Sequence, residues 1–253
     1  MRLTLSSLAL AGALLAPMAA SADPLDLDAM SEADRTQFRA EVRAYLLDNP
    51  EVIFEAIQIL EERRNLAATE ADRELVTNNA EALFNDGFSW VGGNPDGDVT
   101  VVEFLDYRCG YCKRAHPEIQ ELLERDPNVR LIVKEFPILG PDSVRAGKIA
   151  LAALELDKSK YEAFNDELMN YQGNLTEQVA YRIAGELGYD IADLKELAGS
   201  SQIDDRLNRN YQVARALRLE GIPAFVVGTE VIRGYLPVED MLAAVQEARI
   251  AQN

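Results

Sequence analysis

The first third of the chain carries apolar residues at helical spacing. One stripe occupies positions i, i+4, i+7 and i+8, a pattern typical of an amphipathic helix: Phe38, Val42, Tyr45 and Leu46. Ser31 with Asp34 three residues later resembles a capping box, so we expect this helix to begin there. Asn49 ends it, because a residue before proline avoids the α region, and Pro50 suits the first turn of a second helix.

A second apolar stripe follows Pro50, and a weaker one resumes before residue 84: Ile53, Phe54, Ile57 and Leu60, then Leu75, Val76, Leu83 and Phe84. Apolar heptads are not sustained, so a long coiled coil is not predicted. The pattern predicts an N-terminal helical arm over residues 23–84. Because a short arm cannot bury its stripe alone, it packs either on its own domain or on another chain; we favour oligomerisation through the arm.

The pattern changes to alternating strands and helices over residues 85–253. Apolar, β-branched runs predict strands: Val99–Leu105, Val129–Glu135 and Ala224–Val227, with residues 231–233 pairing back on the last as a hairpin. A glycine-rich cluster over residues 92–97 predicts a turn. Helical patterns cover residues 113–124, 143–219 and 237–250. The fold class is therefore α/β, with a βαβ unit, a helical insertion at about 143–219 and a preceding helical arm.

Composition and charge narrow the class of protein. The chain has 253 residues, of which 48% are hydrophobic and 27% charged, so a packed core is expected and disorder is not. Lys and Arg total 25 against 43 Asp and Glu, which gives a net charge of −18. A chain this acidic repels phosphate backbones, so we expect no nucleic-acid partner.

The first residues have the pattern of a secretory signal peptide. Arg2 precedes a mostly Leu and Ala stretch over residues 3–16, and Ala20-Ser21-Ala22 forms a cleavage site before Asp23. The alternative, a membrane anchor, needs about 20 apolar residues, more than this stretch supplies. We therefore expect residues 1–22 to be a signal peptide and the mature protein to occupy an oxidising compartment, most simply a bacterial periplasm.

Cysteine and histidine are scarce, which limits the chemistry. The sequence holds two cysteines, Cys109 and Cys112, and one histidine, His116. A four-ligand zinc site and a framework of several disulfides are both excluded. A C-x-x-C pair between a predicted strand and helix is typical of a thioredoxin-like redox site. The helix dipole favours the Cys109 thiolate by about 0.3–1 kcal/mol, and Cys112 lies one turn further on, where it can resolve a mixed disulfide.

Two other interpretations of the pair stay open. As a structural bridge, its four-residue loop would contribute only about 1.9 kcal/mol, against about 4.7 kcal/mol for a 100-residue loop. As a metal site, Cys109 and Cys112, with or without His116, could hold Cu(I), because two thiolates suffice for that ion.

Several motifs together resemble the DsbA family of thiol–disulfide oxidoreductases over about residues 84–253. They occur in this order: Val102-Glu103-Phe104, Cys109-Gly110-Tyr111-Cys112-Lys113-Arg114-Ala115-His116-Pro117-Glu118, Phe136-Pro137-Ile138-Leu139-Gly140 and Gly221-Ile222-Pro223-Ala224-Phe225. The arm over residues 45–51 is similar to the N-terminal region of ScsC-type proteins, the suppressor-of-copper-sensitivity relatives.

The resemblance implies a thioredoxin fold in residues 85–253, interrupted by the helical insertion. It also implies a cis peptide between Ile222 and Pro223 that faces the cysteines and offers a backbone edge to a substrate strand. Where family members often have Thr or Val before this proline, the chain has Ile222. An acid at Glu103 is expected beneath the disulfide, where it relays protons; the alternative is an acid at the strand end that reaches solvent.

The remaining site residues expected from the resemblance are Gly110, Tyr111 and His116, which support the active site. A histidine that only packs against a helix or faces solvent is the alternative for His116. The Gly110-Tyr111 dipeptide resembles that of dimeric periplasmic isomerases, so we favour a disulfide isomerase or reductase over a monomeric dithiol oxidase.

The expected partners are unfolded or wrongly bridged proteins, a second copy of the chain, and a membrane protein that resets the cysteines. No cofactor is expected. A Cu(I)-binding module and a client-binding module without turnover are the alternatives from another functional class.

Overall fold

A computed structural model describes residues 30–251. The predicted signal peptide over residues 1–22, like residues 23–29 of the predicted arm, lies outside the described residues. The chain divides into two compact units between Leu60 and Glu61. The domain boundary that the sequence predicts at residue 84 stays a prediction.

The first unit contains α1 (Glu32–Asp48) and the start of α2 (Glu51–Asn78). Ser31 caps α1 as predicted: its hydroxyl accepts a hydrogen bond from the Asp34 amide, and the Asp34 carboxylate accepts one from the Ser31 amide. The break at Asn49 and Pro50 is also confirmed. No residue of α1 is buried, so its apolar side chains are exposed to solvent together with those at the start of α2.

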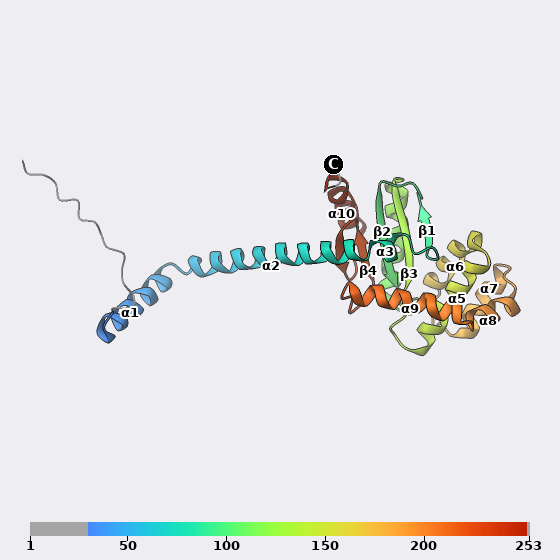
Figure 1. The fold of residues 1–253 in the computed structure, drawn as a ribbon, viewed down its shortest axis with the longest axis horizontal. Helices are drawn as coiled ribbons and strands as arrows, with labels where there is room; N and C mark the ends of the chain where they lie inside the picture. The colour runs from blue at the N-terminus through green and yellow to red at the C-terminus, as the bar shows by residue number, and fades with distance from the viewer. Residues whose placement is uncertain (1–29, 252–253) are drawn as a thin grey trace, which may run out of the picture. The chain divides into compact units, whose positions relative to one another are not determined.

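The second unit is built on a five-stranded sheet with the order β1-β3-β2-β4-β5. Its strands are β1 (Trp90–Gly93), β2 (Val99–Leu105), β3 (Val129–Glu135), β4 (Ala224–Val227) and β5 (Glu230–Arg233). Strands β2 and β3 run parallel, and every other neighbouring pair is antiparallel. Helix α4 (Gly110–Arg125) connects the parallel strands β2 and β3, which lie next to each other in Figure 1, so the predicted βαβ unit is confirmed.

The turn predicted over residues 92–97 begins later than expected. Gly92 and Gly93 belong to β1, where Gly92 pairs with Leu131 of β3. A Cβ atom at Gly92 would lie only 2.0 Å from the Trp90 ring, so the glycine leaves room for that indole over the strand. The ring centroids of Trp90 and Tyr161 are 5.6 Å apart, and this packing keeps the glycine-rich segment in the sheet.

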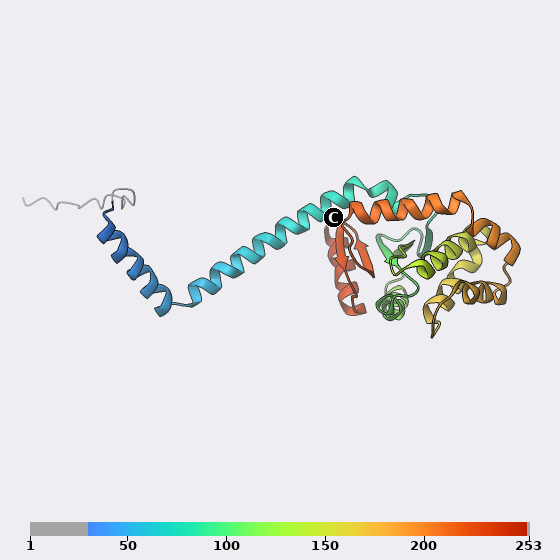
Figure 2. The ribbon, with the colours of Figure 1, turned by 90° about the horizontal axis from the view of Figure 1, so that it is seen from below.

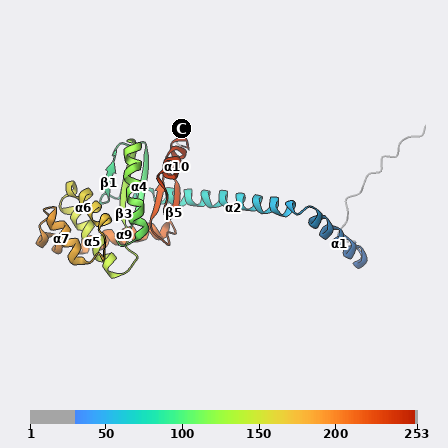
Figure 3. The ribbon, with the colours of Figure 1, turned by 180° about the vertical axis from the view of Figure 1, so that it is seen from behind.

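Helices cover both faces of the sheet (Figure 2). On one face lie α4 and α10 (Val238–Ala251), side by side in Figure 3, together with the first part of the helical insertion, residues 141–198. On the other face lie the end of α2, α3 (Ala80–Phe84) and α9 (Ser201–Ala216). Val76 and Leu83 are buried against this second face, so the weak apolar stripe before residue 84 packs in cis.

The insertion between β3 and β4 is helical, as predicted. It comprises α5 (Pro141–Leu156), α6 (Lys158–Asn170), α7 (Glu177–Glu186), α8 (Ile191–Ala198) and α9. Local polar side chains begin four of these helices by accepting backbone hydrogen bonds: Asp157, Thr176, Asp190 and Ser200. In the part of the chain that the structure describes, no helix combines the length and apolar character needed to cross a membrane.

Side chains along β2 alternate between the two hydrophobic clusters that lie on opposite faces of the sheet. Val101 and Leu105 lie in the cluster that contains Cys112, whereas Val102 and Phe104 lie in the cluster on the opposite face. Since successive strand residues point to opposite faces, Glu103 points to the face covered by α4. This placement puts a carboxyl group beneath the helix that carries the cysteines.

Candidate active site

The two cysteines lie where the loop after β2 enters α4. Cys109 is the N-cap residue of α4, and its amide donates a hydrogen bond to the Asp106 carbonyl oxygen at 3.0 Å. Both cysteines are free thiols. The exposed fraction is 7% for Cys109 and 0% for Cys112, so the first cysteine lies nearer the surface and the second inside the core. The predicted strand-to-helix position of the pair is confirmed.

The environment separates the acidities of the two thiols. A hydrogen bond from the Cys112 side chain and the backbone amides of Tyr111 and Cys112 lowers the pKa of Cys109 to about 6, although burial opposes this. The same side-chain hydrogen bond, together with burial, raises the pKa of Cys112. At neutral pH the pair therefore consists of an ionised Cys109 and a protonated Cys112, the division of roles that a nucleophile and a resolving thiol need.

The loop before β4 faces this pair. The peptide bond between Ile222 and Pro223 is cis, as the sequence resemblance implies. The Cys109 Sγ atom lies 3.7 Å from the carbonyl oxygen of Ile222. Tyr111, between the cysteines, has an exposed fraction of 62%, so its ring is available to a bound molecule. Gly110 begins α4, with open space where a Cβ atom would stand.

Glu103 is a buried carboxyl with an exposed fraction of 2%, so the alternative that it reaches solvent is wrong. Burial raises the pKa of Glu103 to about 7, and the charge of His116 opposes this rise. Its Oε1 atom is buried and has no hydrogen-bond partner within residues 30–251. A carboxyl group that titrates near neutrality inside a core is suited to exchanging protons with a buried thiol. Its predicted role as a relay stays a prediction.

His116 lies one helical turn after Cys112, on the buried side of α4, with an exposed fraction of 5%. Its Nε2 atom is 2.9 Å from Oδ1 of Asp166 on α6, so a solvent-facing histidine is excluded. Among the described residues, no group of three or more His, Cys, Asp and Glu side chains is placed to hold a metal ion. The Cu(I) hypothesis therefore rests on the two sulfur atoms without His116.

The sequence reasoning missed Asp106, a buried carboxylate that joins two loops of the site. Its Oδ1 atom accepts a hydrogen bond from the Arg108 amide at 2.9 Å. Its Oδ2 atom accepts from the amides of Ile138 and Leu139, at 3.0 and 3.1 Å. Asp106 thus fixes the loop before Cys109 to the loop after β3. Its position directly after a buried strand is the signal that could have found it.

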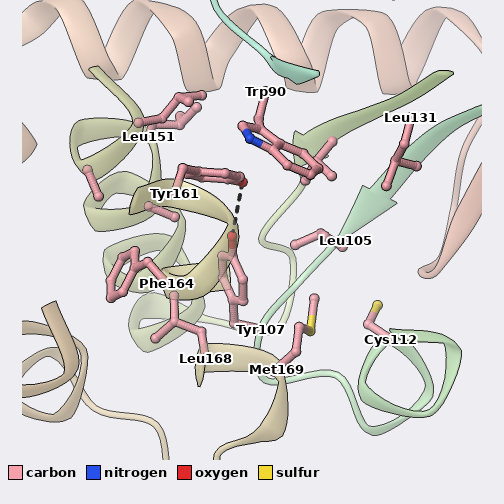
Figure 4. Close-up of a cluster of buried hydrophobic side chains, with 14 of the residues drawn as sticks. Trp90, Leu105, Tyr107, Cys112, Leu131, Leu151, Tyr161, Phe164, Leu168 and Met169 are labelled. Carbon is pink, nitrogen blue, oxygen red and sulfur yellow. Dashed lines mark hydrogen bonds between the residues drawn. The ribbon is translucent and has the colours of Figure 1, made fainter. Parts of the chain in front are cut away.

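A second buried group escaped the sequence reasoning because its members are distant in the chain. The Tyr161 hydroxyl donates to Glu135 Oε1 at 2.5 Å and lies 3.3 Å from the Tyr107 hydroxyl (Figure 4). Burial raises the pKa of Glu135 to about 7. This hydrogen-bonded group ties the loop before Cys109 to the end of β3 and to α6 of the insertion.

Two families of known proteins match the chain. The family described as the DSBA-like thioredoxin domain matches residues 100–246, and the N-terminal domain of the copper resistance protein ScsC matches residues 34–65. The sequence resemblance to DsbA-family and ScsC-type proteins is therefore confirmed.

Three solved structures illustrate the similarity of this chain to known proteins of the same fold. A thioredoxin-like oxidoreductase from Silicibacter pomeroyi DSS-3 is 42% identical, with a TM-score of 0.65 over 67% of this chain and 97% of that one. ScsC of Proteus mirabilis in a transitional conformation is 26% identical, with a TM-score of 0.65 over 88% and 100%. BcfH of Salmonella enterica Typhimurium is 27% identical, with a TM-score of 0.70 over 86% and 96%.

Some of the curated relatives are much longer than the region of this chain that they match. The Na(+)/H(+) antiporter NhaA 3 of Salinispora tropica is 29% identical over 160 residues, and the match spans only 24% of that protein. A probable disulfide bond formation protein D of Bacillus cereus is 27% identical over 146 residues, which cover 68% of its length. The matched sheet, the cysteine pair at the start of α4 and the cis proline opposite it agree with one assignment: this chain belongs to the family of DSBA-like thioredoxin domains.

Proposed function

We propose that the protein is a thiol–disulfide oxidoreductase that acts on protein disulfides through Cys109 and Cys112. The observation that carries the proposal is the position of Cys109 as the N-cap residue of α4, where backbone amides and the Cys112 side chain lower the pKa of its thiol to about 6. Relatives with the same fold include a protein described as a thiol-disulfide exchange protein, from Wolbachia pipientis, 26% identical to this chain.

The proposed reaction has two exchange steps. The Cys109 thiolate attacks one sulfur of a client disulfide, forms a mixed disulfide and releases the other client sulfur as a thiolate. Cys112 then loses its proton and attacks Cys109 Sγ, which releases the second client sulfur and leaves the protein oxidised. The reverse sequence oxidises a client dithiol. The cis-proline loop at Ile222 lies beside Cys109, where an extended client segment can pair with it.

Alkylation of the reduced protein as a function of pH tests the proposal. The rate for Cys109 should show half-ionisation near pH 6, because the lowered pKa makes the thiolate the dominant form at neutrality. Cys112→Ser leaves Cys109 as the single thiol and identifies the signal, and Cys109→Ala should abolish exchange with oxidised glutathione. Half-ionisation near pH 8.5, the value of an ordinary thiol, would contradict the proposal.

Within this activity we favour isomerase or reductase chemistry. The Gly110-Tyr111 dipeptide and the match of residues 34–65 to the ScsC N-terminal domain support this choice. Reactivation of scrambled ribonuclease is the test, with Cys109→Ala as the inactive control. A protein that oxidises dithiols rapidly and leaves the scrambled ribonuclease inactive is instead the oxidase alternative. An equilibrium with glutathione near −200 mV or below fits the isomerase, and one near −120 mV the oxidase.

We also assign the arm to self-association, with a second copy of this chain as its occupant. Its first unit exposes a set of large apolar side chains: Phe38, Val42, Tyr45, Leu47, Ile53, Phe54, Ile57, Ile59 and Leu60. An exposed apolar set of this size is costly in a monomer, and a second copy of the same arm would cover it with matching apolar side chains. Light scattering of the mature protein should give a multiple of the chain mass, and Phe54→Asp should lower it. A monomeric mature protein contradicts this assignment.

The proposed location is the bacterial periplasm, where an oxidising environment suits the cysteine pair. One solved relative, 29% identical, is described as a periplasmic thioredoxin-like protein of Salmonella enterica serovar Typhimurium. The proposed clients are unfolded or wrongly bridged proteins, and a membrane redox protein is proposed to reset the cysteines. Fractionation of cells that express the full sequence tests the location; retention in the cytoplasm contradicts it.

A further inference from the structure

The second exchange step poses a proton problem that the cysteine pair alone does not solve. Cys112 has no exposed surface, and its pKa is raised, so the attacking thiol is protonated at neutral pH and has no direct contact with water. To act as a nucleophile it must deliver its proton to a nearby base. The family resemblance predicts Glu103 as that base, but Glu103 is itself buried, so the proton still has to reach solvent.

His116 and Asp166 lie between the buried Glu103 carboxyl and the protein surface. His116 shares the buried side of α4 with Cys112, four residues earlier, and is close enough to Glu103 of β2 for its charge to act on that carboxyl. On its other side, the imidazole Nε2 atom lies 2.9 Å from Asp166 Oδ1. That oxygen is buried and accepts no hydrogen bond of good geometry among residues 30–251, so the imidazole is its close contact, whereas the Asp166 side chain as a whole is 41% exposed. Asp166 therefore joins the interior to the solvent.

Basic side chains on α4 and on the neighbouring α10 have acidic or carbonyl partners of their own. Lys113, on α4, donates to the Tyr171 carbonyl oxygen beyond the end of α6. Between α4 and α10, Arg125 binds Glu239 at 2.7 Å and Arg249 binds Asp98 and Asp126. Three titratable side chains connect to the imidazole: Glu103 of β2 through its charge interaction, Asp166 of α6 through contact with Nε2, and Cys112 one turn earlier on the same helix.

We propose that Asp166 and His116 form the route by which the Cys112 proton leaves the active site. The inference rests on the proposed oxidoreductase function. When the mixed disulfide is resolved, the S–H bond of Cys112 breaks, and its proton passes to Glu103. The bond between Cys112 Sγ and Cys109 Sγ forms as the client sulfur leaves as a thiolate, with the client disulfide as the oxidant.

The imidazole then receives the proton from Glu103 and passes it to solvent at the Asp166 carboxylate. In the reverse reaction the same route returns a proton to Cys112. Asp166 acts through His116, so it is a positioning residue: its carboxylate holds the imidazole between Glu103 and the solvent.

Exchange with oxidised glutathione in the full mature protein separates the two steps. Acid quenching followed by mass spectrometry measures the formation and the decay of the mixed disulfide between Cys109 and glutathione. In Asp166→Asn, formation should proceed at the wild-type rate, whereas decay should slow by about tenfold or more near pH 7. The deficit should shrink towards pH 9, where hydroxide replaces the base, and free imidazole should accelerate decay more in this variant than in the wild type.

Two matched variants complete the design. Glu167→Gln removes the same charge from the exposed neighbour on α6 and should leave both steps unchanged. Asp166→Glu restores the carboxylate and should recover most of the decay rate. Decay of the mixed disulfide at the wild-type rate in Asp166→Asn overturns the proposal, and so does equal slowing of formation and decay. If the wild-type protein forms no mixed disulfide at Cys109, the oxidoreductase function itself fails, a result distinct from both.

Discussion

The buried carboxyl of Glu103 should make the stability of the thioredoxin unit depend on pH. Burial raises its pKa from the ordinary value of 4.5 to about 7. Because the folded protein binds this proton more tightly than the unfolded chain, stability is lost as the pH rises from 4.5 through 7. At about 1.36 kcal/mol per pH unit, the ionised carboxyl lowers the free energy of unfolding by about 3 kcal/mol at pH 8, and by less than about 1 kcal/mol at pH 5.

Glu103→Gln removes this titration and nearly keeps the shape of the side chain. Relative to the wild type, the variant should therefore gain about 2.5 kcal/mol between pH 5 and pH 8. Burying the neutral glutamine amide costs the same free energy at pH 5 and at pH 8, so this cost does not affect the difference between the two pH values. Glu135, whose pKa is also raised to about 7, titrates in both proteins and cancels in the comparison.

Urea unfolding of the reduced protein at the two pH values measures the effect. Trp90 is the single tryptophan of the sequence and is buried in the core cluster of the second unit, so its fluorescence reports on that unit. Glu124→Gln, an exposed change on α4, is the matched control and should show no pH-dependent gain. If Glu103→Gln changes stability equally at pH 5 and pH 8, Glu103 is not a buried carboxyl with a raised pKa.

Three further predictions concern buried polar groups and metal binding. Asp86→Ala should destabilise the second unit by about 3–5 kcal/mol in urea, because it strips the partner, 2.6 Å away, from the fully buried Lys134 ammonium; a loss below 1 kcal/mol would contradict this. Tyr161→Phe should cost about 1–3 kcal/mol in the same assay, since Glu135 loses its hydroxyl donor; unchanged stability would refute it. Finally, the reduced protein should bind one Cu(I) ion in a titration against a competing chelator, and the Cys109→Ala variant should bind none. A dissociation constant weaker than micromolar for the wild type would contradict the copper hypothesis.

The local sequence predicts much of this fold because short-range physics decides it. The β-branched run before Cys109 favours a strand, and the apolar spacing after Cys112 favours a helix. Ser31 with Asp34 fixes the start of α1 through hydrogen bonds three residues apart, and Pro50 ends its last turn. These features act within a few residues, so they can be predicted before any tertiary contact is known.

Other parts of the site depend on contacts that no local pattern contains. The strand at Gly92 pairs with β3 and carries Trp90, whose ring lies over the glycine and against Tyr161, about seventy residues away. The cis bond before Pro223 was expected only through the family resemblance.

The sequence by itself determined that Cys109 stands at a helix N-terminus and that Cys112 follows one turn later in the same helix. Three residues of spacing fix this relation once the helix begins at Cys109. Only the tertiary structure decided that Asp166 of the insertion reaches His116, and that Glu103 is sealed from water. The physical reason is that burial and proton affinity depend on everything that surrounds a group. Those surroundings come from segments that are distant in the chain and meet only in the folded protein.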